Sequence, residues 1–405
     1  MGARIVILGA GQAGAALAAK LRSEGHDGAI TLIGEEATPP YQRPPLSKKY
    51  LLGETPKERL FLKPEAWYAE NDVDLRIGVR AEAVDLESRQ VVLAGGEAVP
   101  FDLLAFCTGA RPRWLPEAMG GALPGVFAMR DLADADALGG ELREGARALV
   151  IGGGYIGLEA AAVLASRGAE AVLVEAADRI LGRVASGETA TWFADLHRGK
   201  GVTVIEGAAL ERLEAGEDGH LAAARLGDGR RIEADFAVVG IGVIPNGDLA
   251  EAAGIETVRG AIRVDARART SADGVFAAGD CTILPWRGRE IRLESVQNAI
   301  DQAEAAAMEM LGKGEDYDPV PWFWSDQYDV KLQIAGLGAE WDRVVERPGA
   351  REGAVSHWYF RDGELIAVDA MNDPRAYMTG KRWLEAGKSP DADALADPQT
   401  DLKTL

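Results

Sequence analysis

Short apolar runs, a glycine-rich turn and a helical stretch alternate at the start of the chain. Arg4–Leu8 is mostly apolar, the turn Gly9–Gly14 (GAGQAG) follows it, and Ala13–Glu24 has helical composition. A second apolar run, Ile30–Ile33, ends just before Glu35. A strand, a glycine turn, a helix and a strand within about thirty residues predict the βαβ unit of a parallel sheet.

The same order recurs about 140 residues later, at the usual size of a βαβ unit. The apolar run Ala148–Ile151 leads into Gly152–Gly157 (GGGYIG), a helical stretch covers Ile156–Arg167, and Ala171–Val174 ends at Glu175. This internal duplication predicts an α/β protein with two Rossmann-like domains and therefore two nucleotide-sized sites.

The other elements are predicted from alternation and from turn residues. Strands are expected at Leu86–Leu93, Asp102–Thr108 and Gly274–Ala278, and a long helix capped by Ser295 is expected over Ser295–Leu311. The last part begins at the aromatic segment Pro321–Tyr328 and is expected to form an α+β domain. It alternates as strands at Lys331–Leu337, Val355–Phe360 and Leu365–Asp369, and turns helical at Thr379–Glu385. The acidic tail Ser389–Leu405 is expected to be solvated and loose.

Composition narrows the class of protein. The chain has 405 residues, enough for two or three domains, and its formal net charge of −20 excludes a whole-surface attraction to nucleic acid or to anionic lipid. No run approaches the ~20 apolar residues of a membrane span. Gly9, Gly11 and Gly14 interrupt the N-terminal apolar stretch, and the basic Lys20 and Arg22 follow it where a signal peptide would need a cleavage site. We expect a soluble, cytoplasmic protein.

The glycine turns have a physical reason. The first glycine makes the tight turn out of the strand, the second lets a pyrophosphate approach the backbone, and the third lets the helix pack closely on the sheet. One such turn is as often a plain turn as a binding site, but two copies in the same context predict two dinucleotide sites. Glu35 and Glu175 stand where an acid would bind an adenosine ribose. Glu175 would repel a 2′-phosphate, which favours NADH, although Arg179 and Arg183 nearby would favour NADPH.

Five segments, in this order, carry a specific resemblance. They are RPPLSK at Arg43–Lys48, GGGYIGLE at Gly152–Glu159, GIGVIPN at Gly240–Asn246, AGDC at Ala278–Cys281 and PWFWSDQ at Pro321–Gln327. The chain resembles the NADH-dependent ferredoxin reductases of putidaredoxin-reductase type, within the pyridine nucleotide–disulfide reductase superfamily. The resemblance implies an FAD domain at 1–113 and 242–320, an inserted NADH domain at 114–241 and a C-terminal reductase domain at 321–405.

The resemblance also implies which residues bind the cofactors. For FAD they are Gly9, Gly11, Ala13, Gly14, Glu35, Lys48, Ala81, Arg130, Asp280, Val296 and Trp324. The remaining cofactor-binding positions, on or beyond the second glycine turn, are Gly152, Gly154, Ile156, Gly157, Glu175, Arg183 and Gly242.

The sequence departs from the disulfide-reducing relatives. Tyr41-Gln42-Arg43 stands where some of them carry a redox cysteine, so thiol–disulfide chemistry is not expected. Cys107 and Cys281 are expected to be buried small apolar residues, and the chain has too few cysteines for an iron–sulfur cluster of its own. The four histidines are scattered without metal-ligand spacing, so they are expected to be structural and no metal site is expected.

Lys48 and Glu159 are the predicted catalytic pair. Glu159 shares a helix face with apolar residues, where a carboxylate needs a partner. It could instead be a first-turn glutamate favoured by the helix dipole, and Lys48 could be a surface lysine. The resemblance implies that the two pair beside the flavin and the nicotinamide. It also implies that the helix at Ser295 stabilises reduced flavin and that Trp322 or Trp324 lies over the flavin. The structural alternatives are that the helix is only a capped helix and that the tryptophans are core aromatics.

These expectations combine into an NADH:ferredoxin oxidoreductase. It would pass electrons from NADH through FAD to a separate [2Fe–2S] ferredoxin that serves a cytochrome P450 or a Rieske oxygenase. The alternatives are a rubredoxin or monodehydroascorbate reductase, and an apoptosis-inducing-factor-like redox-sensing scaffold. The basic segment Arg375–Lys388 is the candidate docking surface, or else a solvated helix face. We expect a monomer or a weak homodimer.

Overall fold

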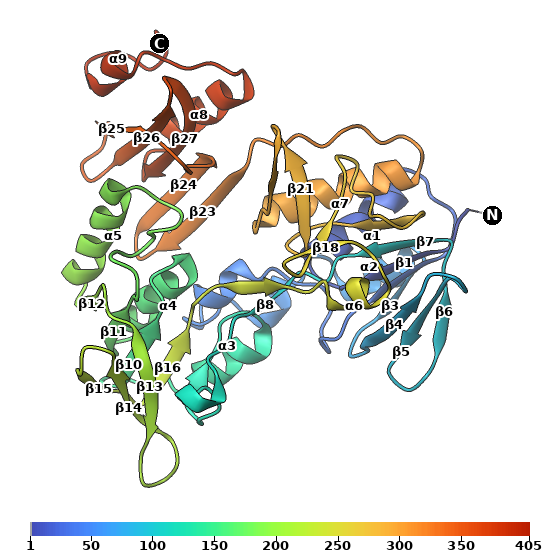
Figure 1. Cartoon of the computed structure of the whole chain (residues 1–405), viewed down its shortest axis with the longest axis horizontal. Helices are drawn as coiled ribbons and strands as arrows, with labels where there is room; N and C mark the ends of the chain where they lie inside the picture. Colours follow the sequence, from blue (N-terminus) through green and yellow to red (C-terminus); the bar gives the residue numbers. More distant parts are fainter. Residues whose placement is uncertain (1) are drawn as a thin grey trace. The chain divides into compact units, whose positions relative to one another are not determined.

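The computed structural model describes residues 2–405, which form two compact α/β units. Unit 1 consists of residues 2–42, Lys57–Arg111 and Val243–Pro319, and unit 2 of Arg43–Pro56, Pro112–Gly242 and Val320–Leu405. Figure 1 colours the chain in sequence order, so each unit is recognised by its separate colour ranges. The chain therefore passes between the units five times, and neither unit is one continuous segment.

Unit 1 is built on a parallel five-stranded sheet in the order β20-β7-β1-β2-β3. Helices α1 and α7 pack on each other and on this sheet through small side chains, among them Ala18, Ala303 and Ala307. The elements of unit 1 are β1 (Ile5–Leu8), α1 (Gln12–Ser23), β2 (Ile30–Ile33), the 3₁₀ helix η2 (Lys57–Leu60), α2 (Glu65–Glu70), β3 (Val73–Arg76), β4 (Ala81–Asp85), β5 (Gln90–Leu93), β6 (Ala98–Pro100), β7 (Leu103–Phe106), β8 (Ala110–Pro112, whose last residue belongs to unit 2), β17 (Val243–Pro245), α6 (Asp248–Ala252), β18 (Thr257–Val258), β19 (Ala261–Arg263), β20 (Val275–Ala277), β21 (Thr282–Trp286), β22 (Arg289–Ile291) and α7 (Val296–Met310).

Unit 2 repeats the same architecture with a second parallel sheet, β12-β11-β10-β16-β9. It then adds an antiparallel sheet, β23-β24-β27-β26-β25. The elements of unit 2 are the 3₁₀ helices η1 (Pro44–Ser47) and η3 (Glu117–Met119), β9 (Val126–Phe127), α3 (Leu132–Gly139), β10 (Arg147–Ile151), α4 (Tyr155–Ser166), β11 (Glu170–Val174), α5 (Gly187–Gly199), β12 (Thr203–Ile205), β13 (Leu210–Ala215), β14 (Leu221–Leu226), β15 (Arg231–Glu233), β16 (Phe236–Val239), β23 (Trp322–Gln327), β24 (Val330–Gly336), β25 (Arg343–Pro348), β26 (Val355–Arg361), β27 (Glu364–Met371), α8 (Pro374–Glu385) and α9 (Ala392–Ala396).

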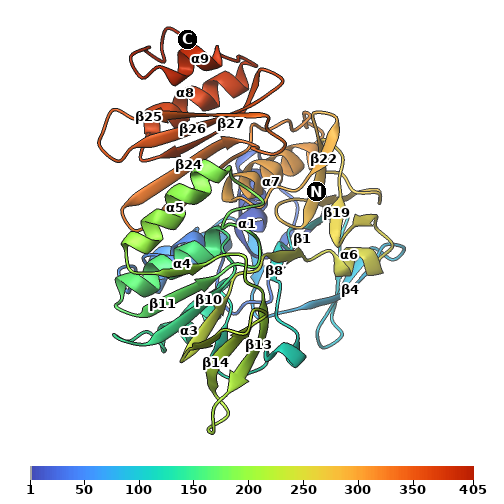
Figure 2. The same ribbon diagram turned by 60° about the vertical axis from the view of Figure 1, so that its left-hand side comes forward.

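The antiparallel sheet is covered on both faces, and strand alternation decides which side chain meets which helix. Helix α8 lies across one face, where Trp358 and Val368 are close enough to Gly380 that a Cβ there would meet them at 3.1 and 2.5 Å. Figure 2 shows α8 on this face and α5 against the other. Tyr359 and His357 point the opposite way and hydrogen-bond to Ser186 and Thr189 at the start of α5. The C-terminal sheet and the second parallel sheet are therefore joined through α5.

Each of the two parallel sheets has an ion pair between an arginine and an aspartate at its amino edge, and the two pairs have the same geometry. In unit 1 the Arg4 backbone N–H and guanidinium bond the Asp102 carboxylate, at 2.7 Å each. In unit 2 the Arg147 backbone N–H and guanidinium bond Asp235 at 2.9 and 2.6 Å. Each arginine adjoins or begins the strand that precedes a glycine turn, and each aspartate precedes the neighbouring strand. The arginines lower the pKa of both aspartates, that of Asp102 to about 2.

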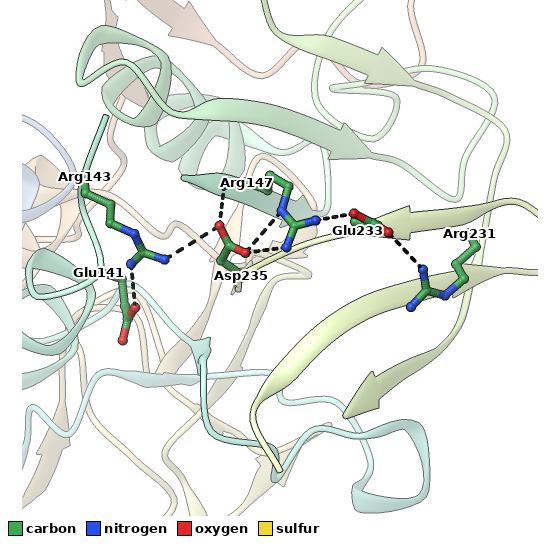
Figure 3. Close-up of polar contacts among 6 residues, drawn as sticks. All are labelled: Glu141, Arg143, Arg147, Arg231, Glu233 and Asp235. Carbon is green, nitrogen blue, oxygen red and sulfur yellow. Dashed lines mark hydrogen bonds and ion pairs between the residues drawn. The ribbon is translucent and has the colours of Figure 1, made fainter. Parts of the chain in front are cut away.

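In unit 2 this ion pair belongs to a wider group of ion pairs, drawn in Figure 3. Arg147 also pairs with Glu233, Arg143 contacts Asp235 at 3.7 Å, and Arg231 contacts Glu233 at 3.5 Å. These side chains are partly exposed to solvent, and exposed pairs of this kind each contribute at most about 1 kcal/mol. The group ties strand starts together at the edge opposite to the glycine turn, so we assign it a structural role.

Two predictions made from the sequence, the strand at Leu86–Leu93 and the loose C-terminal tail, were wrong. Residues Leu86–Leu93 are not one strand: β4 and β5 form a hairpin whose turn includes Arg89 with φ +52°, a left-handed value that ends a strand. The tail is not loose, because α9 forms within it and Leu395 and Leu402 are buried in the C-terminal core. The buried Arg347 guanidinium donates to four tail carbonyls, those of Leu395, Asp397, Pro398 and Thr400.

Candidate functional site

The first glycine turn has the geometry of a phosphate-binding loop. Gly9 has φ +110°, and a Cβ there would lie 2.1 Å from the carbonyl oxygen of Cys107. A Cβ at Gly14 would lie 2.0 Å from the Gly9 carbonyl oxygen, so α1 can approach the sheet this closely only with glycine. A Cβ at Gly11 would meet no atom within 4 Å, which leaves room for a ligand at that backbone.

The second turn repeats this geometry position by position. Gly152 has φ +107°, a Cβ at Gly157 would lie 2.0 Å from the Gly152 carbonyl oxygen, and a Cβ at Gly154 would meet nothing within 4 Å. Gly11 and Gly154 are also the N-caps of α1 and α4, and neither helix has a side chain that caps its first N–H groups. Two uncapped helix starts beside open space fit the pyrophosphates of two dinucleotides.

Other predicted FAD residues gather around the first turn, within unit 1. Glu35 follows β2 and Asp280 follows β20, so both stand at the carboxyl edge of the sheet that β1 shares. Gly279, with φ +86°, brings its backbone so close that a Cβ would lie 3.2 Å from Ala13 Cβ. Val296 begins α7, which Ser295 caps by accepting from Asn298 N at 3.1 Å, as predicted. Ala81 begins β4.

The predicted residues of the second turn gather within unit 2. The Glu175 carboxylate accepts from the backbone N–H groups of Gly153 and Ala177, both at 2.7 Å. Gly242 has φ +100°, and the atom nearest to a Cβ there would be the Arg183 guanidinium at 3.7 Å. Ile156 is 38 % exposed on the first turn of α4. Glu175, Arg183 and Gly242 thus belong to the loops around the glycine turn.

Lys48 and Glu159 form an ion pair in unit 2. Lys48 Nζ lies 2.6 Å from Glu159 Oε2, and the side chains are 15 % and 6 % exposed. Lys48 is placed by η1, which begins at the stiff Pro44-Pro45 and packs on α4. Of the two interpretations that the sequence left open for each residue, the structure supports the pair.

Two serines missed by the sequence analysis complete this group. Ser47 Oγ donates to Glu159 Oε2 and Ser325 Oγ donates to Glu159 Oε1, each at 2.7 Å. Both hydroxyls are buried, and both lie within motifs that were recognised for other residues, RPPLSK and PWFWSDQ. A buried serine inside a motif was the available signal, but its partner lies more than 100 positions away.

Two further predicted FAD residues belong to unit 2. The Arg130 carbonyl accepts from Arg43 at 2.9 Å, and its backbone N–H donates to Asp134 at 2.8 Å. Trp324 packs against Trp322 in a tilted arrangement with 5.7 Å between ring centroids, while Phe323 packs on Tyr155 with 5.0 Å between centroids. The two tryptophans share one face of β23 and Phe323 takes the other, as alternation predicted. The predicted FAD residues are therefore distributed over both units.

The cysteines are buried, as the sequence predicted. Cys107 and Cys281 are buried, and burial raises the pKa of both thiols, so neither is a ready nucleophile. Within residues 2–405, no three His, Cys, Asp or Glu side chains are grouped so as to hold a metal ion. In the same range no helix is both long and apolar enough to cross a membrane.

Comparison with known proteins places this geometry in a family. Residues 3–303 match the family described as pyridine nucleotide-disulphide oxidoreductase, and residues 322–405 match a reductase C-terminal domain. The chain is 42 % identical to a ferredoxin–NAD(P)(+) reductase of Sphingomonas sp over 99 % of this chain and 97 % of the relative. It is 35 % identical to the putidaredoxin reductase of Pseudomonas putida over 99 % and 96 %.

A solved structure shows the same likeness. The covalent putidaredoxin reductase–putidaredoxin complex contains a chain that superposes with a TM-score of 0.95 and 35 % identity, over 99 % of this chain and 97 % of that one. The likeness thus extends over nearly the full length of both chains. The chain belongs to the pyridine nucleotide-disulphide oxidoreductase family.

Proposed function

We propose that this protein is an FAD-dependent NADH:ferredoxin oxidoreductase that reduces a [2Fe–2S] ferredoxin serving a cytochrome P450 or a Rieske oxygenase. The observation that carries the proposal is the pair of equivalent glycine turns joined to a reductase C-terminal domain, in a chain whose relatives are ferredoxin reductases over their full length. FAD, when bound, supplies the redox chemistry that lets a two-electron donor feed a one-electron acceptor.

The residues divide the work of binding. The turn Gly9–Gly14 would hold the FAD pyrophosphate, Glu35 its adenosine ribose and Asp280 its ribityl–phosphate part. The N–H groups at the start of α7, including that of Val296, would stabilise negative charge at the flavin pyrimidine ring. Arg130, Ala81 and Trp324 would complete the contacts to FAD. The breaks of unit 1 at 111, 243 and 319 support the outer bounds of an FAD domain near 1–113 and 242–320, while residues 43–56 within that range group with unit 2.

The second turn would hold the nicotinamide dinucleotide. Gly152, Gly154, Ile156 and Gly157 would bind its pyrophosphate, with Arg183 and Gly242 beside them. Glu175 would bind the adenosine ribose, and its negative charge supports NADH rather than NADPH. Its hydrogen bonds to Gly153 and Ala177 hold the carboxylate at the carboxyl edge of the sheet.

Lys48 and Glu159 would act where the nicotinamide meets the flavin. The ammonium group of Lys48 is held by Glu159 and the Lys48 side chain is 15 % exposed, so the cation keeps a fixed position on a side chain that still reaches solvent. A fixed cation of this kind can orient a reactant and stabilise negative charge that develops beside it. A cytoplasmic location and a monomer or weak homodimer remain predictions.

The acceptor decides between the candidate activities. NADH oxidation is measured under anaerobic conditions with an oxygenase [2Fe–2S] ferredoxin, with a rubredoxin, with monodehydroascorbate and with ferricyanide, which needs no docking surface. We expect the ferredoxin to give the highest kcat/KM of the three biological acceptors. A preference for rubredoxin or monodehydroascorbate would name that activity instead. Slow turnover with every acceptor, together with a long-lived flavin–nicotinamide complex, would favour the redox-sensing scaffold.

A further inference from the structure

A chain of buried hydrogen bonds continues from Glu159 into the C-terminal domain. Ser325, which donates to Glu159, accepts from Gln327 Nε2 at 3.2 Å. Gln327 Oε1 lies 2.8 Å from His197 Nε2, and His197 Nδ1 lies 3.3 Å from the Tyr328 hydroxyl. The chain thus connects α4, β23 and α5, all within unit 2.

The members of this chain are as buried as the apolar core. His197 and Ser325 are fully buried and Gln327 is 1 % exposed. A buried polar side chain without a hydrogen-bond partner destabilises the fold, so these three side chains are held in one specific arrangement by their mutual hydrogen bonds. Burial also lowers the pKa of His197, which keeps its imidazole neutral near pH 7.

The hydrogen bonds can be satisfied together in one direction. Glu159 as a carboxylate only accepts, so Ser325 donates to it and must accept from the Gln327 amide nitrogen. The amide oxygen of Gln327 then faces His197 and requires a proton on Nε2. A neutral imidazole protonated at Nε2 accepts at Nδ1, where the Tyr328 hydroxyl can donate. Every donor in the chain therefore points toward Glu159.

We propose that Ser325, Gln327 and His197 are positioning residues that orient the Lys48–Glu159 pair for hydride transfer. His197 fixes which way the Gln327 amide is turned, the amide fixes the Ser325 hydroxyl, and that hydroxyl occupies Glu159 Oε1. Glu159 Oε2 is left to Ser47 and Lys48. A rotation of the carboxylate would move the ammonium group, and a misplacement near 1 Å can cost about a hundredfold in rate.

This inference rests on the proposed function, because it needs the pair to lie beside the reacting groups. A purely structural role for His197 would be to join α5 to the C-terminal sheet. The protein contains a matched control for that role. His357 is also fully buried and also joins α5 to the sheet, through Thr189 Oγ1 at 2.7 Å, in a group with Tyr359 and Asp369.

The test compares His197→Leu, His197→Gln, Gln327→Met and the control His357→Leu, each as the full FAD-loaded chain. Anaerobic stopped-flow with NADH and with 4,4-dideuterated NADH gives the limiting rate of flavin reduction, the apparent Kd for NADH and the deuterium isotope effect. FAD content and the melting temperature report on folding.

We expect His197→Leu and Gln327→Met to lower the limiting rate about tenfold or more, with an unchanged Kd and a larger isotope effect. His197→Gln keeps a donor toward Gln327 and should recover most of the rate, while His357→Leu should lower the melting temperature and leave the rate unchanged. Equal rates in wild type and Gln327→Met, or an equal loss in His357→Leu, would overturn the proposal. Failure of NADH to reduce the wild-type flavin would instead contradict the proposed function.

Discussion

Removal of Lys48 should destabilise unit 2 more than removal of the whole ion pair. In Lys48→Met, the Glu159 carboxylate stays buried with two serine donors and no cation. At 2.6 Å and an effective dielectric constant near 20, the lost attraction is ~6 kcal/mol before desolvation is subtracted. Loss of one partner of a buried pair typically costs about 3–5 kcal/mol, so we expect a loss in that range.

The double variant Lys48→Met/Glu159→Gln is the decisive comparison. It leaves no buried charge, and its amide oxygen can still accept from Ser47 or Ser325. Its free energy of unfolding should therefore lie within about 1.5 kcal/mol of the wild type. The expected order of stability is wild type, then the double variant, then Lys48→Met.

Urea unfolding monitored by tryptophan fluorescence measures the free energy of unfolding of each variant. Of the nine tryptophans, Trp67 and Trp286 lie in unit 1, which leaves seven in unit 2. Flavin reduction by NADH should be slow in both variants, because neither keeps the Lys48 cation. The two variants should therefore differ in stability but not in the rate of flavin reduction. If Lys48→Met is as stable as the double variant, Glu159 is not an uncompensated charge and the reasoning fails.

Three further predictions concern cofactor choice, docking and pH. Glu175→Ala should reduce the ratio of kcat/KM for NADH over NADPH, and an unchanged ratio would remove Glu175 from the site. Reversal of charge at Lys381 and Arg382 should raise the ferredoxin KM and leave ferricyanide reduction intact; unchanged ferredoxin kinetics would place docking elsewhere. Burial raises the pKa of Asp369 from 3.8 to about 6, so the folded state holds this proton more tightly than the unfolded state. Stability should therefore fall by about 2 kcal/mol as pH rises from 4 to 6, and a urea titration of Asp369→Asn should lack this slope.

The local parts of the site could be predicted from the sequence. Gly9 and Gly152 have positive φ because the tight turn formed by their neighbours in the sequence requires it. The N-cap at Ser295 also depends only on residues nearby in the sequence. That Glu159 needs a partner could also be predicted, because a carboxylate on an apolar helix face is costly, but the choice of Lys48 as that partner came from the family resemblance.

The contacts that depend on tertiary placement could not be predicted. The residues near Gln327 in the sequence do not indicate that its side chain contacts His197, which is 130 positions away. The tail was misjudged for the same reason: its composition is that of a solvated segment, but Arg347 from β25 satisfies its carbonyls. At the candidate docking segment the sequence likewise did not show that Arg375 pairs with Asp401 or that Lys381 lies over the Trp322 ring.

The division of unit 1 into three chain segments has a consequence for synthesis on the ribosome. Strand β7 ends at Phe106, but its sheet neighbour β20 begins at Val275, 275 − 106 = 169 residues later. At about 5–20 residues per second, β7 waits roughly 8 to 34 s with one edge unpaired. An unpaired edge is a template for association with other chains. The second parallel sheet is complete at Val239, inside this interval, so it can form while the first sheet is still open. While the β7 edge is exposed to association with other chains, the parallel sheet of unit 2 can therefore already be folded and the parallel sheet of unit 1 is still incomplete.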